Sequence, residues 1–294
     1  MRRLAARAPG KVNLCLYVGR PRAEDGLHPL ASVVQPVSLA DTVALEAAEG
    51  DADEVLCPAV PGENLAARAL AAFRDATGWD GPPVRITIAK RVPVAGGMGG
   101  GSSDAAATLR LMAAASGLPI PADLPMRLGA DVPVLLHAGR ALMTGAGERV
   151  QPLSVPARDT RLVIVPVDAE LPTSAVYRAC DELGNARPAH ELIALAANLR
   201  DRGEPPAVND LQEAAISLCP AIVPVLDAVA QHGPALVSGS GPTVFARVAD
   251  ARAGADGGAE ARAESAAAAL RAAGLSRAVA ATPVDPAFAA VRPA

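Results

Sequence analysis

The residues best suited to chemistry lie in one short stretch, Arg91–Asp104, which reads RVPVAGGMGGGSSD. Five of the residues between positions 96 and 101 are glycine. Glycine carries no side chain, so it adopts positive φ and lets an anion approach the backbone closely. Ser102 and Ser103 follow, and each is placed to cap a helix or to donate a hydroxyl to phosphate or Mg²⁺. The stretch therefore predicts a phosphate-binding loop.

The segments on either side of the glycines predict the elements that must hold this loop. Upstream, residues 84–89 alternate apolar and polar side chains, as a strand does. Downstream, Ala105, Leu109 and Met112 recur at helical spacing, up to a stop at Gly117. The loop is thus expected between a strand and a helix N-terminus, where unpaired N–H groups and the helix dipole attract phosphate.

Two familiar nucleotide-binding patterns do not describe this loop. The pattern GxxxxGK[ST] is absent because no lysine follows the glycines, and GxGxxG with a distant acid fits poorly. A flexible turn capped by serine is the plainer alternative. It is disfavoured because so many glycines cost chain entropy unless the backbone must approach something. Lys90 and Arg91, directly upstream, are rival sources of positive charge.

Length and composition exclude several classes of function. A chain of 294 residues predicts one large domain or two of ordinary size. A net charge of −4 and three Phe, two Tyr and one Trp argue against a nucleic-acid partner. The scattered cysteines predict reduced thiols, not disulfides or zinc. Because the start lacks a secretory signal and no uncharged apolar run reaches ~18–20 residues, we expect a cytoplasmic protein without membrane partners.

The remaining chain predicts strands and helices in mixed order. Expected strands are 11–18, 30–39, 42–46, 141–143, 150–153, 161–167, 235–238, 243–248 and 278–282. Expected helices are 64–77, 121–128, 174–183, 190–199, 209–218, 220–232 and 263–273. A linker at 154–160 places the domain boundary, which divides the chain into 1–156 and 157–294. Residues 250–262 have the composition of a solvated loop or an irregular helix start.

Three signatures stand in order along the chain, at Pro9–Leu14, Pro93–Ala106 and Val237–Thr243. Together they resemble the GHMP kinase superfamily. Further segments, GLH at 26–28, GADVP at 129–133 and PTSAVY at 172–177, resemble the members that act on a cytidine diphosphate-linked methylerythritol. The resemblance runs from about residue 8 to about residue 248 and so covers most of the chain.

This resemblance implies an α+β fold in two domains with the active site in the cleft between them. The N-terminal, ATP-binding domain would be like the second domain of ribosomal protein S5, and the C-terminal, substrate-side domain like a ferredoxin. The implied reaction transfers phosphate from ATP, with Mg²⁺, to the 2-hydroxyl of that small molecule, in the non-mevalonate route to isoprenoid precursors. Whether the protein is a monomer or a homodimer is left open.

The resemblance also assigns roles to single residues. Asp131 is the candidate base and Lys11 its catalytic partner, contacting the acceptor hydroxyl or the phosphate. Without the resemblance, Asp131 fits a turn former or a helix cap equally well. Lys11 then fits a surface lysine whose charged end reaches the solvent. The candidates for ATP binding are Pro93, Val94, Ala95, Gly96, Gly97, Met98, Gly99, Gly100, Gly101, Ser102 and Ser103. The candidates for substrate binding are Asn13, His28, Tyr177, Gly239, Ser240 and Gly241.

Several points remain open at this level. Ser103 and Asp131 are candidates to touch the metal, but magnesium keeps many waters, so its ligands stay unassigned. Residues 239–243 also fit a plain hairpin turn, and Asn209–Leu211 fits the family without an assigned chemistry. Leu27 stands where the family has an aromatic residue, which removes one wall of a cytosine pocket. The alternatives are a GHMP kinase for homoserine or mevalonate, or a non-catalytic nucleotide-binding regulator.

Overall fold

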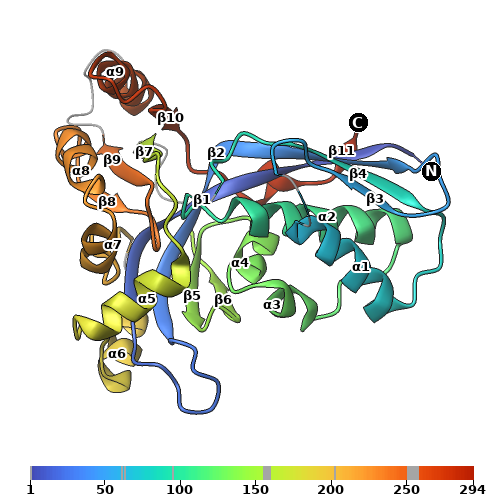
Figure 1. Cartoon of the computed structure of the whole chain (residues 1–294), viewed down its shortest axis with the longest axis horizontal. Helices are drawn as coiled ribbons and strands as arrows, with labels where there is room; N and C mark the ends of the chain where they lie inside the picture. The colour runs from blue at the N-terminus through green and yellow to red at the C-terminus, as the bar shows by residue number, and fades with distance from the viewer. Residues whose placement is uncertain are drawn as a thin grey trace.

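The computed structural model describes residues 2–60, 62, 64–94, 96–154, 160–201, 203–249 and 258–294 (Figure 1). Within them, seven strands form one sheet in the order β11-β1-β2-β4-β3, with β5 paired to β2 and β6 to β5. These strands are β1 (Leu4–Val18), β2 (Leu30–Ala47), β3 (Glu54–Leu56), β4 (Val84–Ala89), β5 (Ala141–Gly145), β6 (Arg149–Pro152) and β11 (Arg292–Pro293). Four helices lie along one face of this sheet in Figure 1, namely α1 (Leu65–Thr77), α2 (Gly100–Ser116), α3 (Leu124–Leu128) and α4 (Val132–His137).

The second half of the chain forms a four-stranded antiparallel sheet, as far as the described residues go, in the order β10-β7-β9-β8. Its strands are β7 (Thr160–Val165), β8 (Ala235–Val237), β9 (Val244–Ala249) and β10 (Val279–Ala281). Helices α8 (Ile222–Ala230) and α9 (Gly258–Ala272) pack on it. This arrangement is the ferredoxin-like one, with paired central strands and two crossover helices. Helices α5 (Thr173–Glu182), α6 (Ala189–Asp201) and α7 (Gln212–Leu218) precede β8. The expected α+β fold is confirmed.

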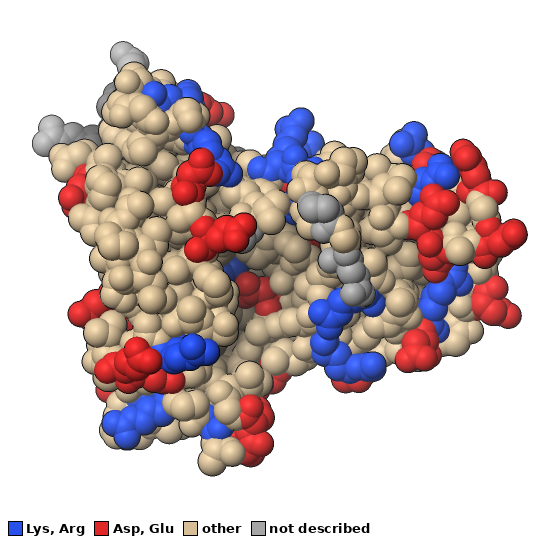
Figure 2. All heavy atoms as spheres, viewed as in Figure 1, with Lys and Arg blue, Asp and Glu red and all other residues tan. Residues whose placement is uncertain are grey.

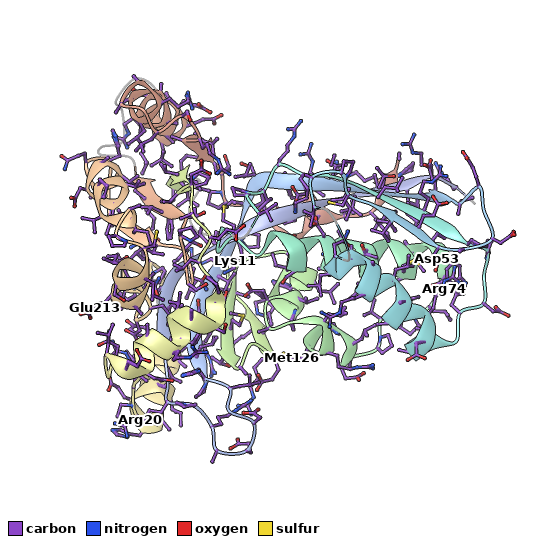
Figure 3. All side chains as sticks on the ribbon, viewed as in Figure 1. Lys11, Arg20, Asp53, Arg74, Met126 and Glu213 are labelled. Atoms are coloured by element: carbon purple, nitrogen blue, oxygen red, sulfur yellow. The ribbon has the colours of Figure 1, made fainter. Side chains whose placement is uncertain are left out.

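The two sheets share a hydrophobic core that is built on β1. Val12 and Leu14 of β1 are buried in one cluster with Leu162 and Ile164 of β7 and Phe245 of β9. The opposite face of β1 contacts α2. Because both of its faces are covered, β1 is buried almost continuously from Ala8 to Val18. Polar side chains on this strand therefore lie at the junction of the two sheets, as the central position of Lys11 in Figure 3 shows.

Strand β2 differs from the prediction, because it is one strand where the sequence predicts two. The sequence predicts two strands that end and restart around Asp41, because a carboxylate is disfavoured inside a sheet. Instead β2 runs unbroken through Asp41, which pairs with Ala8 of β1 and is fully buried. Its charge is matched by Lys90, whose Nζ lies 2.5 Å away. An ion pair between distant segments thus lets the strand continue.

Other element boundaries differ by a few residues. The helix expected at 121–128 begins only at Leu124, and α4, with Pro133 in its first turn, was not anticipated. The strand expected at 11–18 is longer, because β1 begins at Leu4. Residues 282–294 return to the first sheet, where β11 pairs with β1. The division at 156/157 lies outside the described residues and stays a prediction. Of the segment 250–262, residues 250–257 also lie outside them, whereas 258–262 form the start of α9, which begins before the predicted residue 263. No helix in the described ranges is long and apolar enough to cross a bilayer.

Candidate active site

A cavity of about 1160 Å³ opens between the two sheets. Its walls come from β1, the glycine loop, the start of α4, helix α5 and the turn between β8 and β9. The space-filling view shows the molecule hollowed between its two halves (Figure 2). The candidate residues that line it are Lys11, Asn13, His28, Pro93, Val94, Gly96, Gly97, Gly99, Gly100, Gly101, Ser102, Asp131, Tyr177, Gly239, Ser240 and Gly241. The fold thus brings together segments that are far apart in the sequence.

The glycine loop joins β4 to α2, as the sequence predicts. Gly97 and Gly99 adopt positive φ, 72° and 65°, and Gly99 takes the N-cap position of α2 without any side-chain cap. The N-terminus of α2 therefore faces the cavity through bare backbone at Gly100 and Gly101. Backbone N–H groups at a helix start form a binding site for phosphate.

Two described members of the predicted loop, Ser103 and Met98, do not line the cavity. Ser103 is fully buried, and its hydroxyl donates to the carbonyl of Pro9 at 2.8 Å. The N-cap of α2 is Gly99 and not Ser103, and the role of Ser103 toward phosphate or metal stays a prediction. Met98 is also fully buried and packs in the core between the sheets, while its carbonyl accepts from the Lys11 N–H. Ala95 lies outside the described residues.

Lys11 and Asp131 meet inside the cavity. Lys11 Nζ lies 3.5 Å from Asp131 Oδ2, and it donates a hydrogen bond to Asn13 Oδ1 at 2.8 Å. The Lys11 side chain is only 5% exposed, so the alternative of a surface lysine is wrong. Asp131 occupies the N-cap of α4, but its carboxylate makes no cap hydrogen bond and is 28% exposed. Both charged residues line the cavity.

Asn13 is held in place by its own hydrogen bonds. Its Nδ2 donates to Ser32 Oγ at 2.8 Å, and that hydroxyl donates onward to the Cys15 carbonyl at 2.7 Å. This fixes the orientation of the Asn13 amide, so its oxygen points at Lys11. These hydrogen bonds fix the orientation of the Lys11 ammonium group through Asn13. Sequence spacing alone does not reveal them.

Lys90, which the sequence offers as a rival source of positive charge, is a second buried lysine, and its ion-pair partners were not predicted. Lys90 Nζ contacts Asp41 at 2.5 Å and Asp104 at 2.8 Å, and both Lys90 and Asp104 line the cavity. Burial raises the pKa of Asp104 to about 7, although the charge of Lys90 opposes the shift. Burial disfavours the charge of Lys90, but Asp104 and Asp41 outweigh it and raise the pKa of this lysine. Arg91, by contrast, has an exposed side chain. No sequence signal links Lys90 to a carboxylate 49 residues upstream.

Tyr177, the aromatic candidate for substrate binding, lies on the wall of the cavity that α5 forms. The Tyr177 ring lies 4.9 Å from the His28 ring, centroid to centroid, with the planes tilted by 47°. His28 Nε2 is 3.0 Å from Asp181 Oδ1, a partner that the sequence analysis did not single out. Burial, and then the charge of Asp131, raise the pKa of Tyr177. Leu27 also lines the cavity and is 45% exposed.

The turn Ser238–Thr243 connects the antiparallel strands β8 and β9, so it is a hairpin turn, and it also forms a wall of the cavity. Gly239 has φ of 58°, and a Cβ there would lie 3.2 Å from Lys11 Nζ and 3.1 Å from Asn13 Oδ1. The N–H of Thr243 donates to the carbonyl of Gly96. The turn therefore contacts both the lysine and the glycine loop.

The cavity continues past the glycine loop toward α1. Cys57, Val60 and Leu65 line this end, together with Asn64. Asn64 caps α1 through a hydrogen bond from the Ala67 N–H to its Oδ1, at 3.0 Å. This mostly apolar end adjoins the glycine loop, and no sequence pattern points to its residues.

The fold and the site define a GHMP kinase. The family described as GHMP kinases N terminal domain matches residues 64–140, and the one described as GHMP kinases C terminal matches residues 179–274. A homoserine kinase from Cytophaga hutchinsonii, 14% identical, has the same fold with a TM-score of 0.63, covering 99% of this chain and 97% of its own.

A narrower likeness comes from proteins of higher identity. The 4-diphosphocytidyl-2-C-methyl-D-erythritol kinase of Mycobacterium tuberculosis is 42% identical over 264 residues, which cover 82% of this chain and 80% of the relative. A crystal structure of 4-(cytidine 5'-diphospho)-2C-methyl-D-erythritol kinase superposes with a TM-score of 0.74 at 35% identity, covering 95% of this chain and 98% of its own. The chain belongs to the family of 4-diphosphocytidyl-2-C-methyl-D-erythritol kinases.

Proposed function

We propose that this protein transfers the γ-phosphoryl group of ATP to the 2-hydroxyl of 4-diphosphocytidyl-2-C-methyl-D-erythritol, in the non-mevalonate route to isoprenoid precursors. The observation that carries the proposal is the Lys11–Asp131 pair, 3.5 Å apart, in the same cavity as the glycine loop at the start of α2. A phosphate on the loop and an alcohol beside Asp131 would lie next to one another. The names of the relatives at 42% and 35% identity support the choice of alcohol.

In this mechanism each charged group has a defined task in the transfer step. Asp131 accepts the proton of the attacking hydroxyl, since its carboxylate is not used for capping α4. Lys11 stabilises the negative charge that spreads over the transferred group, and its burial makes that interaction stronger than in water. The backbone from Gly97 to Gly101 holds the phosphates in line with the hydroxyl. Asn13 keeps the lysine ammonium aimed at this point.

The residues present fit a magnesium ion that enters with the nucleotide. No group of three or more His, Cys, Asp or Glu side chains suited to a metal occurs in the described parts of the chain. Magnesium rarely needs one, because it keeps several waters and binds substrate phosphates with one or two carboxylates. Ser102 and Asp131 are the oxygen donors on the cavity wall that would hold it. Bound there, the ion would neutralise phosphate charge.

The two ends of the cavity suit the two substrates. The apolar end at Cys57, Val60 and Leu65 adjoins the glycine loop, so we place the adenine ring there. The end with Tyr177 and His28 lies on the Asp131 side and offers a ring face to cytosine. With Leu27 in place of an aromatic residue, the cytosine would stack on one side only.

A coupled assay of ADP release tests the proposal. The cytidyl substrate, homoserine and mevalonate are each supplied with ATP and Mg²⁺ to the purified protein. We expect turnover with the cytidyl substrate alone. Preferred turnover of homoserine or mevalonate would assign another GHMP activity. ATP binding without turnover of any alcohol would favour the non-catalytic alternative.

A further inference from the structure

Asn209 is a buried amide whose hydrogen-bonding groups all have partners. Its Nδ2 donates to the carbonyl of Val237 at 2.9 Å and to that of Gly239 at 2.8 Å. Its Oδ1 accepts from the N–H of Leu211 at 2.9 Å. A primary amide has two N–H donors, and here both are spent on the carbonyls of β8 and of the turn that follows it.

The backbone around Asn209 is fastened to β1, the strand that carries Lys11. The Leu16 N–H donates to the Val208 carbonyl at 2.8 Å, and the Asp210 N–H donates to the Leu16 carbonyl at 3.0 Å. The segment thus lies beside the strand as a short parallel bridge. Asn209 therefore links β1 through its backbone to the turn through its side chain.

The turn needs such a link because it sits against the reacting groups. A Cβ on Gly239 would lie 3.2 Å from Lys11 Nζ, and one on Gly97 would lie 2.5 Å from the carbonyl oxygen of Ser238. A displacement of the turn would therefore change the surroundings of Lys11 and of the glycine loop. A misplacement of about 1 Å near reacting groups can reduce a rate by ~10²-fold.

We infer that Asn209 is a positioning residue for phosphoryl transfer, which acts by holding the Gly239 turn against Lys11 and Asn13. The inference rests on the proposed function. Asn209 touches neither the cavity nor the reacting atoms. Its loss should therefore reduce kcat. The binding of ATP should change little, because the nearest atoms to Gly100 at the helix start belong to Val92 and Lys90 and not to the turn.

The test compares Asn209→Asp with the wild type in steady-state kinetics. The aspartate keeps an acceptor for the Leu211 N–H, but its carboxylate cannot donate to the carbonyls of Val237 and Gly239. We expect kcat per folded molecule to fall by ~10–100-fold, with KM for ATP within about threefold. Relative to wild type, the rate should recover as the pH falls from about 8 to about 6. A carboxyl buried against carbonyls gains a proton readily and can then donate again.

Gln212→Met is the matched control. Gln212 Oε1 accepts from the Val237 N–H at 3.0 Å, so this amide also holds β8, but it has no bond to the turn. We expect its kcat to stay within about twofold of wild type. If Asn209→Asp does not fold, Asn209→Ser, which donates one bond at most, gives the same comparison.

The outcomes are distinct. A kcat loss at Asn209 with wild-type KM for ATP, absent from Gln212→Met, supports the inference. Unchanged kcat per folded molecule in a folded Asn209 variant overturns it, as does an equal loss in Gln212→Met. A wild-type protein that does not phosphorylate the cytidyl substrate refutes the proposed function instead, whatever Asn209 does.

Discussion

Substituting Gly97 by alanine tests how tightly the glycine loop fits the second sheet. Gly97 has φ of 72°, and a Cβ there would lie 2.5 Å from the Ser238 carbonyl oxygen and 2.6 Å from that of Gly241. The left-handed conformation costs a residue with a Cβ about 1–2 kcal/mol. Overpacking against backbone that cannot move freely adds about 1–3 kcal/mol. We expect Gly97→Ala to lower the free energy of unfolding by about 2–5 kcal/mol.

Gly117→Ala separates the two contributions. Gly117 ends α2 with φ of 74°, almost the value at Gly97, but a Cβ there meets no atom within 4 Å. This variant should therefore show the conformational cost alone, about 1–2 kcal/mol. Urea unfolding measures both variants against wild type. In the same preparations, kcat/KM for ATP should fall at least about tenfold for Gly97→Ala and remain unchanged for Gly117→Ala.

Equal destabilisation of the two variants would contradict this prediction. It would mean that the loop and the turn Ser238–Thr243 do not press on each other in solution. A Gly97→Ala protein with wild-type kcat/KM for ATP would likewise show that the fit of the loop has no bearing on nucleotide use.

Three further predictions concern single side chains. Asp131→Asn and Lys11→Met should each fold normally and bind ATP in calorimetry while kcat falls by ~10²-fold or more; near-normal kcat would remove either residue from the mechanism. Tyr177→Ala should raise KM for the cytidyl substrate, because stacking is worth ~1–3 kcal/mol per base, and it should leave KM for ATP unchanged. Leu27→Tyr should lower KM for the cytidyl substrate by up to about tenfold. An unaltered KM in Tyr177→Ala would place the base elsewhere. Between about pH 8 and pH 6 the wild type should gain about 1.4 kcal/mol of unfolding free energy, since Asp104, with a pKa of about 7, takes up a proton in the folded state only. Asp104→Asn should lack this gain in urea unfolding, and identical slopes in the two proteins would contradict the assignment.

The parts of the site that the sequence reveals are those whose signal is local. Glycines next to a strand and a helix predict the phosphate loop, and the structure places Gly97–Ser102, Met98 excepted, on the cavity wall. The Lys11–Asp131 pair came from motif resemblance, and the 3.5 Å separation agrees with it. Local patterns fail where two neighbouring residues of the same type have different surroundings. The hydroxyls of Ser102 and Ser103 look alike in sequence, yet only Ser102 reaches the cavity, because helical geometry turns Ser103 toward Pro9.

What stays hidden from the sequence depends on long-range contacts. The ion cluster of Asp41, Lys90 and Asp104 joins β2, the residue that follows β4, and α2, and it explains why β2 continues where a break was expected. The positioning role that we infer for Asn209 depends on its hydrogen bonds to carbonyls 28 and 30 residues downstream. Hydrophobic periodicity sets which face of a strand is buried, but it does not say which distant polar group will meet a buried charge.

We propose that the cavity between the sheets is the place where phosphate passes from ATP to a cytidyl-linked alcohol. Phosphorus NMR of the products, after incubation of the protein with ATP, Mg²⁺ and 4-diphosphocytidyl-2-C-methyl-D-erythritol, tests it most directly. We predict ADP and one new phosphomonoester on the methylerythritol unit, with the cytidine diphosphate linkage intact. ADP and inorganic phosphate without a new phosphomonoester, or no reaction at all, would contradict the proposed function.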